Sequence, residues 1–342
     1  MHLIYSIYCN ITDILKYSLY ATTYILIFIS GLLVNGAALW VLCCFISKKN
    51  KAIIFIISLS VADLAHVLSL PLRIYYYNSH HWSFLKALCL LCFYLKYLNM
   101  YASICFLTCL SLQRCFFLLK PFRAREWKRR YDVSISADIW IIVGTACSPL
   151  PILRTAGLAN NTESCFSNLR FKHIRMTSSI GMISVAEHGG LFLTAAIISY
   201  CTWKMRKSLQ EFQAPLQNTK ERKRALWMVL ICAVVFTVCF TPYHLNFLFY
   251  MLVKQHVFST CSFTKITLYF HIISLCLANL NCYLHSIVCY FMTSEFHNRL
   301  LEHSGLVLHL HVRHKDRPLE IHHKKEELQT ISPTNLNDSK IT

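Results

Sequence analysis

The sequence predicts an all-α membrane protein: a bundle of seven transmembrane helices followed by a short interfacial eighth helix. Apolar residues make up 55% of the 342 residues and charged residues only 15%, which is too apolar for a soluble domain of this length. A helix needs roughly 20 mostly apolar residues to cross a bilayer. Seven stretches meet this requirement, at residues 19–46, 52–77, 87–118, 135–154, 176–203, 225–253 and 264–292.

The remaining segments are assigned in chain order. Residues 1–18 contain Asp13 and no apolar run followed by small residues, so we expect an extracellular N-terminus rather than a cleavable signal. Residues 19–292 form the transmembrane domain, in which the fifth span is the weakest because Glu187 and His188 interrupt it. Residues 293–302 fit an interfacial helix, and the polar residues 303–342 fit a disordered cytoplasmic tail.

Basic residues predict the orientation of the spans. They concentrate in alternate loops, for example at 48–51, 120–130 and 204–224, and such loops face the cytoplasm. The chain is therefore expected to be a multi-pass plasma-membrane protein with its N-terminus outside. Candidate glycosylation sites at Asn10 and Asn160 fall on the outer side. The net charge of +18 then reflects topology and contact with anionic membrane lipids, and nucleic-acid binding is not expected.

Four of the 17 cysteines are expected on the oxidising side of the membrane. Cys89 opens the third span, Cys165 lies in the loop after the fourth, Cys9 precedes the first span and Cys261 lies in the last outer loop. Extracellular cysteines commonly pair, so Cys89–Cys165 and Cys9–Cys261 are candidate disulfides. Most other cysteines lie inside spans, where a small buried apolar side chain is their ordinary role.

Short motifs in the spans make the sequence similar to a rhodopsin-like G-protein-coupled receptor. They are Asn35 in GLLVN, Asp63 in SLSVADL, Trp82 in the first outer loop, Trp140 in the fourth span, and FTVCFTPYH with Phe236, Phe240 and Pro242. The resemblance covers residues 18–301 and keeps the order and spacing of the family. It implies a membrane receptor that signals through a heterotrimeric G protein, with the sixth-span motif as part of its switch.

Arg114 ends the apolar run of the third span, in the stretch CLSLQRCFF. The resemblance assigns it to the arginine that contacts the G protein. The family usually carries an acidic residue before this arginine, whereas this chain has Gln113. The salt bridge that restrains the arginine at rest is therefore expected to be absent. An arginine that snorkels at the membrane edge is the alternative explanation.

Cations within the spans indicate an acidic ligand. Arg73 follows Pro71 near the outer end of the second span, and Lys96 lies two helical turns inward of Cys89. A cation at membrane depth is costly unless it is paired or hydrated. Further candidate ligand-binding residues are Tyr97, Tyr101, Arg154, His244 and His271. The alternative for the tyrosines is helix packing, and for the histidines a structural hydrogen bond.

The stretches SLPLRIYYY, FYLKYLNMYASICFLTCLSLQRCFFLLKPFR and CFTPYHLNFLFY resemble the purinergic-like group of receptors, and in particular its lysophospholipid-responsive branch. This resemblance implies lysophosphatidylserine as the agonist and coupling through the G12/13 class. The residues alone indicate only a basic pocket, which would also suit a nucleotide.

A deeper polar set, Asp63, Asn99, Ser103 and Asn281, occupies positions that resemble the family's allosteric sodium site. Oxygen ligands suit this hard cation. A sodium ion is the cofactor that the sequence suggests, and a dry hydrogen-bond network is the alternative.

The seventh span departs from the family pattern. Where relatives carry Asn or Asp, Pro, two residues and Tyr, this chain has His285, Ser286, two residues and Cys289. Thr194 replaces the proline expected in the fifth span. Prolines let membrane helices bend, so a receptor fold with impaired switching is an open alternative. His285 lies one turn beyond Asn281, which predicts that its imidazole faces Asp63.

Other classes of membrane protein fit less well. A channel or transporter would be expected to show internal repeats or a line of intramembrane charges, and neither is evident in the sequence. A spaced catalytic set is not evident either. The chain is therefore not expected to be an enzyme.

Overall fold

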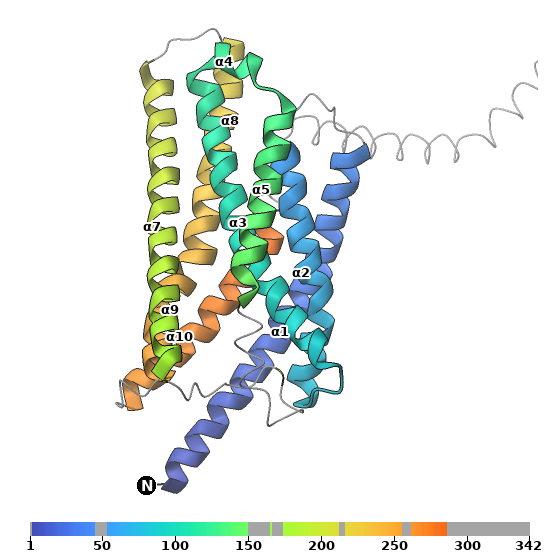
Figure 1. Ribbon diagram of the computed structural model, residues 1–342, viewed down its shortest axis with the longest axis vertical. Coiled ribbons are helices and arrows are strands. Elements are labelled where there is room, and N and C mark those ends of the chain that lie inside the picture. The colour runs from blue at the N-terminus through green and yellow to red at the C-terminus, as the bar shows by residue number, and fades with distance from the viewer. Residues whose placement is uncertain are drawn as a thin grey trace, which may run out of the picture. The chain divides into compact units, whose positions relative to one another are not determined.

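The computed structural model describes residues 2–44, 53–149, 165, 174–211, 216–254 and 261–285, which fall in one compact unit, Met1–Thr293. Within these ranges the structure is helical and long helices lie side by side (Figure 1). The helices are α1 (His2–Cys44), α2 (Ile53–Ser79), α3 (Lys86–Leu119), α4 (Pro121–Glu126), α5 (Arg129–Cys147), α7 (Ile174–Glu211), α8 (Leu216–Val235), the π-helix η1 (Phe236–Phe240), α9 (Thr241–Lys254) and α10 (Cys261–Asn279).

The described helices follow the order of the predicted spans, and α8, η1 and α9 follow one another without a break in the sixth. Residues 150–154 of the predicted fourth span and 286–292 of the seventh lie outside the described residues. Three helices extend well beyond the predicted spans, and one of them is α8, which begins at Leu216, before the predicted span at 225–253. Helix α1 begins at His2, inside the predicted N-terminal segment, and α7 continues to Glu211. Helical hydrogen bonding can continue past the hydrocarbon layer, whereas apolar composition marks only the part at membrane depth.

Five helical segments of the described chain are long and apolar enough to cross a membrane. They are Tyr17–Cys43, Ile53–Ser79, Lys86–Leu119, Arg222–Val253 and Ser262–His285. Helices α5 and α7 fall below this standard. Helix α5 carries Arg129, Arg130 and Asp132 in its first turn, and Glu187 with His188 interrupts α7.

The outer surface of the bundle carries many large apolar side chains, and its largely apolar interior contains a set of buried polar ones. Leu26, for example, is 69% exposed, and large exposed apolar side chains occur on α1, α2, α5, α7 and α10. By contrast, Asn35, Asp63 and His285 are almost completely buried. Soluble proteins seldom expose so many large apolar side chains, so this surface fits a helix bundle that is surrounded by lipid.

Helix α3 packs against four other long helices of the bundle, α2, α5, α7 and α8. Its side chains Phe106, Leu107 and Leu110 are fully buried, and Phe106 packs on Trp140 of α5 with ring centroids 5.8 Å apart. The Tyr94 hydroxyl donates to the carbonyl of Gly144, 3.2 Å away. Residues on α3 are therefore placed to connect distant parts of the chain.

The sixth span contains a proline and the fifth does not, and their helices differ accordingly. Before Pro242, the backbone N–H of Thr241 donates to the carbonyl of Phe236, which gives the widened turn η1. Proline lacks an N–H and its ring crowds the preceding turn, so the helix widens there. In α7, the helix is continuous through Thr194, whose hydroxyl donates to the carbonyls of Gly190 and Leu191 at 2.9 Å.

The predicted interfacial helix at 293–302 and the predicted tail at 303–342 lie outside the described residues. Both stay predictions.

Candidate functional site

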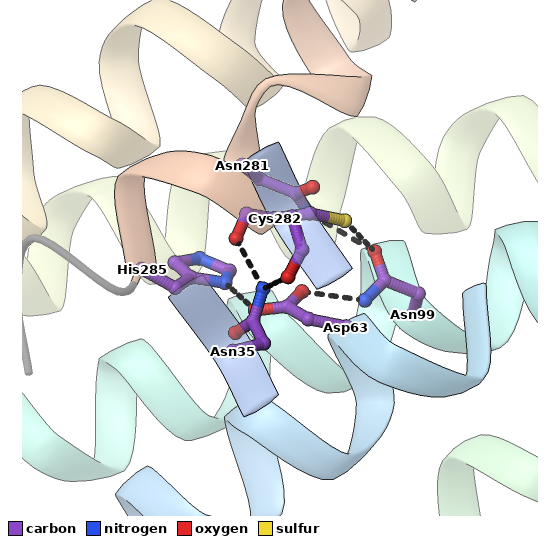
Figure 2. A network of polar contacts seen from close by, with 7 residues as sticks. Asn35, Asp63, Asn99, Asn281, Cys282 and His285 are labelled. Carbon is purple, nitrogen blue, oxygen red and sulfur yellow. Dashed lines mark hydrogen bonds and ion pairs between the residues drawn. The ribbon is translucent and has the colours of Figure 1, made fainter. Parts of the chain in front are cut away.

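The buried carboxylate of Asp63, on α2, is the centre of a polar network in the bundle (Figure 2). Its Oδ1 accepts a hydrogen bond from the side-chain amide of Asn99 at 2.7 Å. Its Oδ2 lies 2.9 Å from Nδ1 of His285. The carboxylate is 0% exposed and the imidazole 1%. The prediction that His285 faces Asp63 is confirmed, and the pair ties the second span to the seventh.

The network continues through Asn281 and Cys282, which follow α10 in a short helical segment (Figure 2). The Asn281 side-chain amide donates to Oδ1 of Asn99 at 3.2 Å. The Asn35 amide, from α1, donates to the carbonyl of Cys282 at 2.8 Å. Side chains from the first, second, third and seventh spans therefore meet at one buried point.

Not every polar atom in this region has a partner in the described part of the chain. The hydroxyl oxygen of Ser103, Oδ1 of Asn281 and Nε2 of His285 are buried without hydrogen-bond partners there. Two of these atoms are oxygens from the predicted sodium set. His285, which is not a member of the predicted set, contacts one carboxylate oxygen of Asp63.

The two predicted cations lie on neighbouring helices. Arg73 is 2% exposed, and its Nη2 donates to the backbone carbonyl of Cys92 on α3 at 2.5 Å. The Lys96 ammonium lies 5.6 Å from the centroid of the Tyr97 ring. Both cations lie within electrostatic range of His66. The structure therefore gathers two positive charges between α2 and α3, inside the bundle.

Aromatic residues and histidines occupy the region toward the fifth, sixth and seventh spans. The ring of Tyr101 lies 6.0 Å from that of His244, and Tyr243 lies 5.4 Å from His244 and 5.9 Å from His271. Tyr243 also forms a hydrogen bond with Tyr97. Arg154, the remaining member of the predicted ligand set, lies outside the described residues.

Sequence reasoning missed one acidic group in this region. The hydroxyl of Tyr101 donates to Oε1 of Glu187, on α7. The sequence does show a carboxylate inside an apolar span. From the sequence alone, it is interpreted only as an interruption of the fifth span. An intramembrane carboxylate is by default a functional candidate.

Arg114 lies at the opposite end of α3, and its Nε and Nη2 are buried without hydrogen-bond partners among the residues described. Gln113, which stands where the family carries an acid, instead donates to Asp132 Oδ1 on α5 at 2.7 Å. Trp127 donates to the same oxygen at 2.9 Å. The polar contact of Gln113 thus goes to the first turn of α5, and its uncharged amide cannot form a salt bridge with Arg114.

The sixth-span switch residues lie beside the Asp63 network. Phe236 and Phe240 have ring centroids 6.3 Å apart, and the Phe240 ring lies 6.5 Å from that of His285. The widened turn η1 and Pro242 are therefore adjacent to the buried pair. A change at Asp63 and His285 could reach the sixth span through this contact.

The predicted disulfide between Cys89 and Cys165 is present, with Cα atoms 5.8 Å apart. It connects the head of α3 to Cys165, which lies in the sequence between α5 and α7. The side chains of Cys9 and Cys261 lie outside the description, as do those of Asn10 and Asn160, so the second disulfide and both glycosylation sites stay predictions.

Replacing Cys89 with serine is expected to lower surface expression and ligand binding strongly. The bridge closes a loop with a sequence separation of 76, and removing a native disulfide costs about 2–5 kcal/mol. Cys105→Ser, which changes a free, half-buried cysteine of the same helix, serves as the control and should be nearly neutral. Quantitative surface labelling of both variants checks this, and equal losses would count against the role of the bridge.

Comparison with known proteins agrees with this architecture. Residues 34–288 match the family model described as 7 transmembrane receptor (rhodopsin family). The chain is 65% identical over 302 residues to the human protein named as putative purinoceptor 10, covering 88% of this chain and 89% of that protein. It is 43% identical to human "Probable G-protein coupled receptor 174" over 86% of this chain and 90% of the relative. It is 29% identical to human "Lysophosphatidic acid receptor 6" over 86% of each. The chain therefore belongs to the rhodopsin family of seven-transmembrane receptors, in the group that includes these purinoceptor-like and lysophospholipid receptors.

Proposed function

We propose that this receptor responds to an anionic lysophospholipid, with lysophosphatidylserine as the agonist, and that it signals through G proteins of the G12/13 class. The family is one of membrane receptors rather than enzymes, and G-protein partners follow from it. The finer assignment rests on two cations inside the bundle, the buried Arg73 of α2 and the half-buried Lys96 of α3. Relatives named for lysophosphatidic acid, which is itself an anionic lysophospholipid, support it.

Arg73 is the observation that carries the proposal. A guanidinium that is 2% exposed inside a membrane bundle is costly unless it is paired, and its bond to the Cys92 carbonyl holds it against α3. Phosphate oxygens accept such donors in charge-assisted bonds. Lys96 adds a second positive charge on the adjacent helix. The aromatic residues Tyr97, Tyr101 and Tyr243 would line the less polar part of the ligand.

A nucleotide is the second candidate agonist, because it also carries phosphate and aromatic surface. The name of the 65% identical human relative contains the word purinoceptor. The two candidates differ in one testable respect: only the lysophospholipid needs an apolar path for its acyl chain.

Replacing Arg73 or Lys96 with alanine is expected to weaken the response to the anionic agonist. Each loses charge-assisted hydrogen bonds that contribute roughly 1.5–3 kcal/mol, or about tenfold or more in potency. Concentration–response curves for lysophosphatidylserine at matched surface density provide the measurement. Lys86→Ala, which removes an exposed cation at the head of α3, is the control. If the Arg73 and Lys96 variants keep the potency of the parent, the basic-pocket assignment fails.

We further propose that the chain lies in the plasma membrane with its N-terminus outside. The Cys89–Cys165 disulfide fits an oxidising compartment at one end of the bundle. The basic loops 120–130 and 204–224 fit the cytoplasmic side. Protease accessibility of an N-terminal epitope on intact cells tests this orientation.

A second functional candidate is a receptor whose switching is impaired, which we call a restrained switch. The bond between Asp63 and His285 favours this candidate. The pair joins the second and seventh spans and occupies a carboxylate that the family uses for sodium. We propose that the imidazole competes with sodium, whose remaining ligands would be Ser103, Asn281 and the Asp63 oxygens. An agonist shifts an equilibrium only if it distinguishes two accessible states, so a bond that favours one state would limit signalling.

A further inference from the structure

Glu187 is a half-buried acid that the proposed set of ligand-binding residues leaves out. Its Oε1 accepts a hydrogen bond from the Tyr101 hydroxyl, which fixes the carboxyl group against α3. Its Oε2 is buried and has no hydrogen-bond partner among the described residues. A carboxylate oxygen without a donor is costly at membrane depth. This oxygen is therefore suited to accept a donor from a bound molecule.

The histidine beside Tyr101 adds a second acceptor. Nδ1 of His244 lies 2.8 Å from the backbone carbonyl oxygen of Phe240. A carbonyl oxygen only accepts hydrogen bonds, so Nδ1 carries the proton. In the neutral ring, Nε2 is then an acceptor. The region around Tyr101 thus offers a carboxylate and an imidazole acceptor, whereas the region around Arg73 offers donors.

The two regions lie on different sides of α3. Arg73 donates to a carbonyl of α3 from α2, whereas Tyr101 reaches Glu187 on α7 from α3. Helix α3 packs against both α2 and α7. A ligand head that carries both a negative and a positive group could therefore contact Arg73 and Lys96 with the negative group and Glu187 with the positive group. A head with negative groups alone would leave Glu187 Oε2 without a donor.

We propose that Glu187 binds a primary ammonium group of the agonist, while Arg73 and Lys96 bind its phosphate or carboxylate. This inference rests on the proposed function and deepens it, because it assigns the ammonium of the phosphoserine head to a specific acid. An ammonium has three donors, so it can satisfy Oε2 of Glu187 and a further acceptor such as His244. Glu187 is thus a specificity-determining residue rather than a further packing contact.

A purely structural role makes a different prediction. If Glu187 only ties α7 to α3 through Tyr101, its loss should weaken the responses to all ligands equally. If it binds the ammonium, its loss should weaken only the response to ligands that carry one. The test therefore needs two lipids, one with a charged amine and one with an uncharged nitrogen. All their other charged groups must be the same.

The experiment compares lysophosphatidylserine with its N-acetyl derivative on the full receptor and on Glu187→Gln, at matched surface density. The derivative keeps the phosphate, the carboxylate and the acyl chain, but its nitrogen carries no charge. We expect the parent to prefer the amine lipid. The glutamine variant should lose roughly tenfold to a hundredfold in potency for this lipid and almost nothing for the derivative.

Two further variants separate charge from folding. Glu187→Asp keeps the carboxylate and should retain part of the preference for the amine. Tyr101→Phe keeps the ring but releases Oε1, and should reduce the same preference. An equal loss for both lipids in Glu187→Gln, or no loss, overturns the inference. A parent that responds to both lipids equally also overturns it but leaves the proposed function standing, whereas a parent that responds to neither overturns both.

Discussion

Replacing His285 with asparagine is expected to make the thermal stability of the receptor depend on sodium. The imidazole lies 2.9 Å from Asp63 Oδ2, and both side chains are buried. Losing a hydrogen bond to a buried carboxylate costs about 1.5–3 kcal/mol. In sodium-free buffer the variant should therefore unfold roughly 3 °C or more below the parent. Sodium should recover part of this loss, since Ser103 and Asn281 offer oxygens without partners in the described structure.

The measurement is the unfolding temperature of the purified receptor, with sodium replaced by an organic cation at constant ionic strength. His66→Asn is the matched control, because His66 is also buried but contacts Asn279 rather than Asp63. The control should show no dependence on sodium. A parent that sodium already stabilises would contradict the competition between the imidazole and the ion.

Restoring the family pattern in the fifth and seventh spans is expected to raise maximal G-protein activation more than agonist affinity. The variant combines Thr194→Pro, His285→Asp, Ser286→Pro and Cys289→Tyr. It removes the Asp63–His285 bond and interrupts α7, which is continuous through Thr194 in the parent. A change of about 1.4 kcal/mol in the balance of two states shifts their ratio tenfold.

G-protein activation at equal surface density, measured together with agonist affinity, checks this expectation. Thr194→Ala with the three seventh-span changes is the control, because it removes the hydroxyl but keeps the backbone N–H. If the restored receptor signals no better than its parent, the receptor already switches by another route, and the restrained-switch candidate fails.

Most of the helical framework could be predicted from the sequence, for a physical reason. Membrane helices satisfy their backbone groups internally and expose apolar side chains to lipid, so composition alone marks them. The third span, predicted at 87–118, is the helix Lys86–Leu119. The ends of α1 and α7 were missed, because nothing in the lipid-facing composition records how far a helix continues into water.

The candidate site was predictable where spacing along one helix determined it. His285 lies one turn from Asn281, which placed its imidazole near Asp63. The bond between Tyr101 and Glu187 joins residues 86 positions apart, and that between Gln113 and Asp132 joins α3 to α5. Such contacts depend on how two helices are rotated against each other. Neither periodicity nor a motif specifies that rotation.

The most direct test of the proposed function is a ligand panel on the surface-expressed receptor. The panel contains lysophospholipids that differ in their head groups, and it also contains nucleotides. Each compound is applied separately, and activation is measured for each G-protein class. We expect lysophosphatidylserine to activate the G12/13 class, with nucleotides inactive and with the response reduced in Arg73→Ala. Activation by nucleotides alone, or silence toward every lysophospholipid at good surface density, would contradict the proposed function.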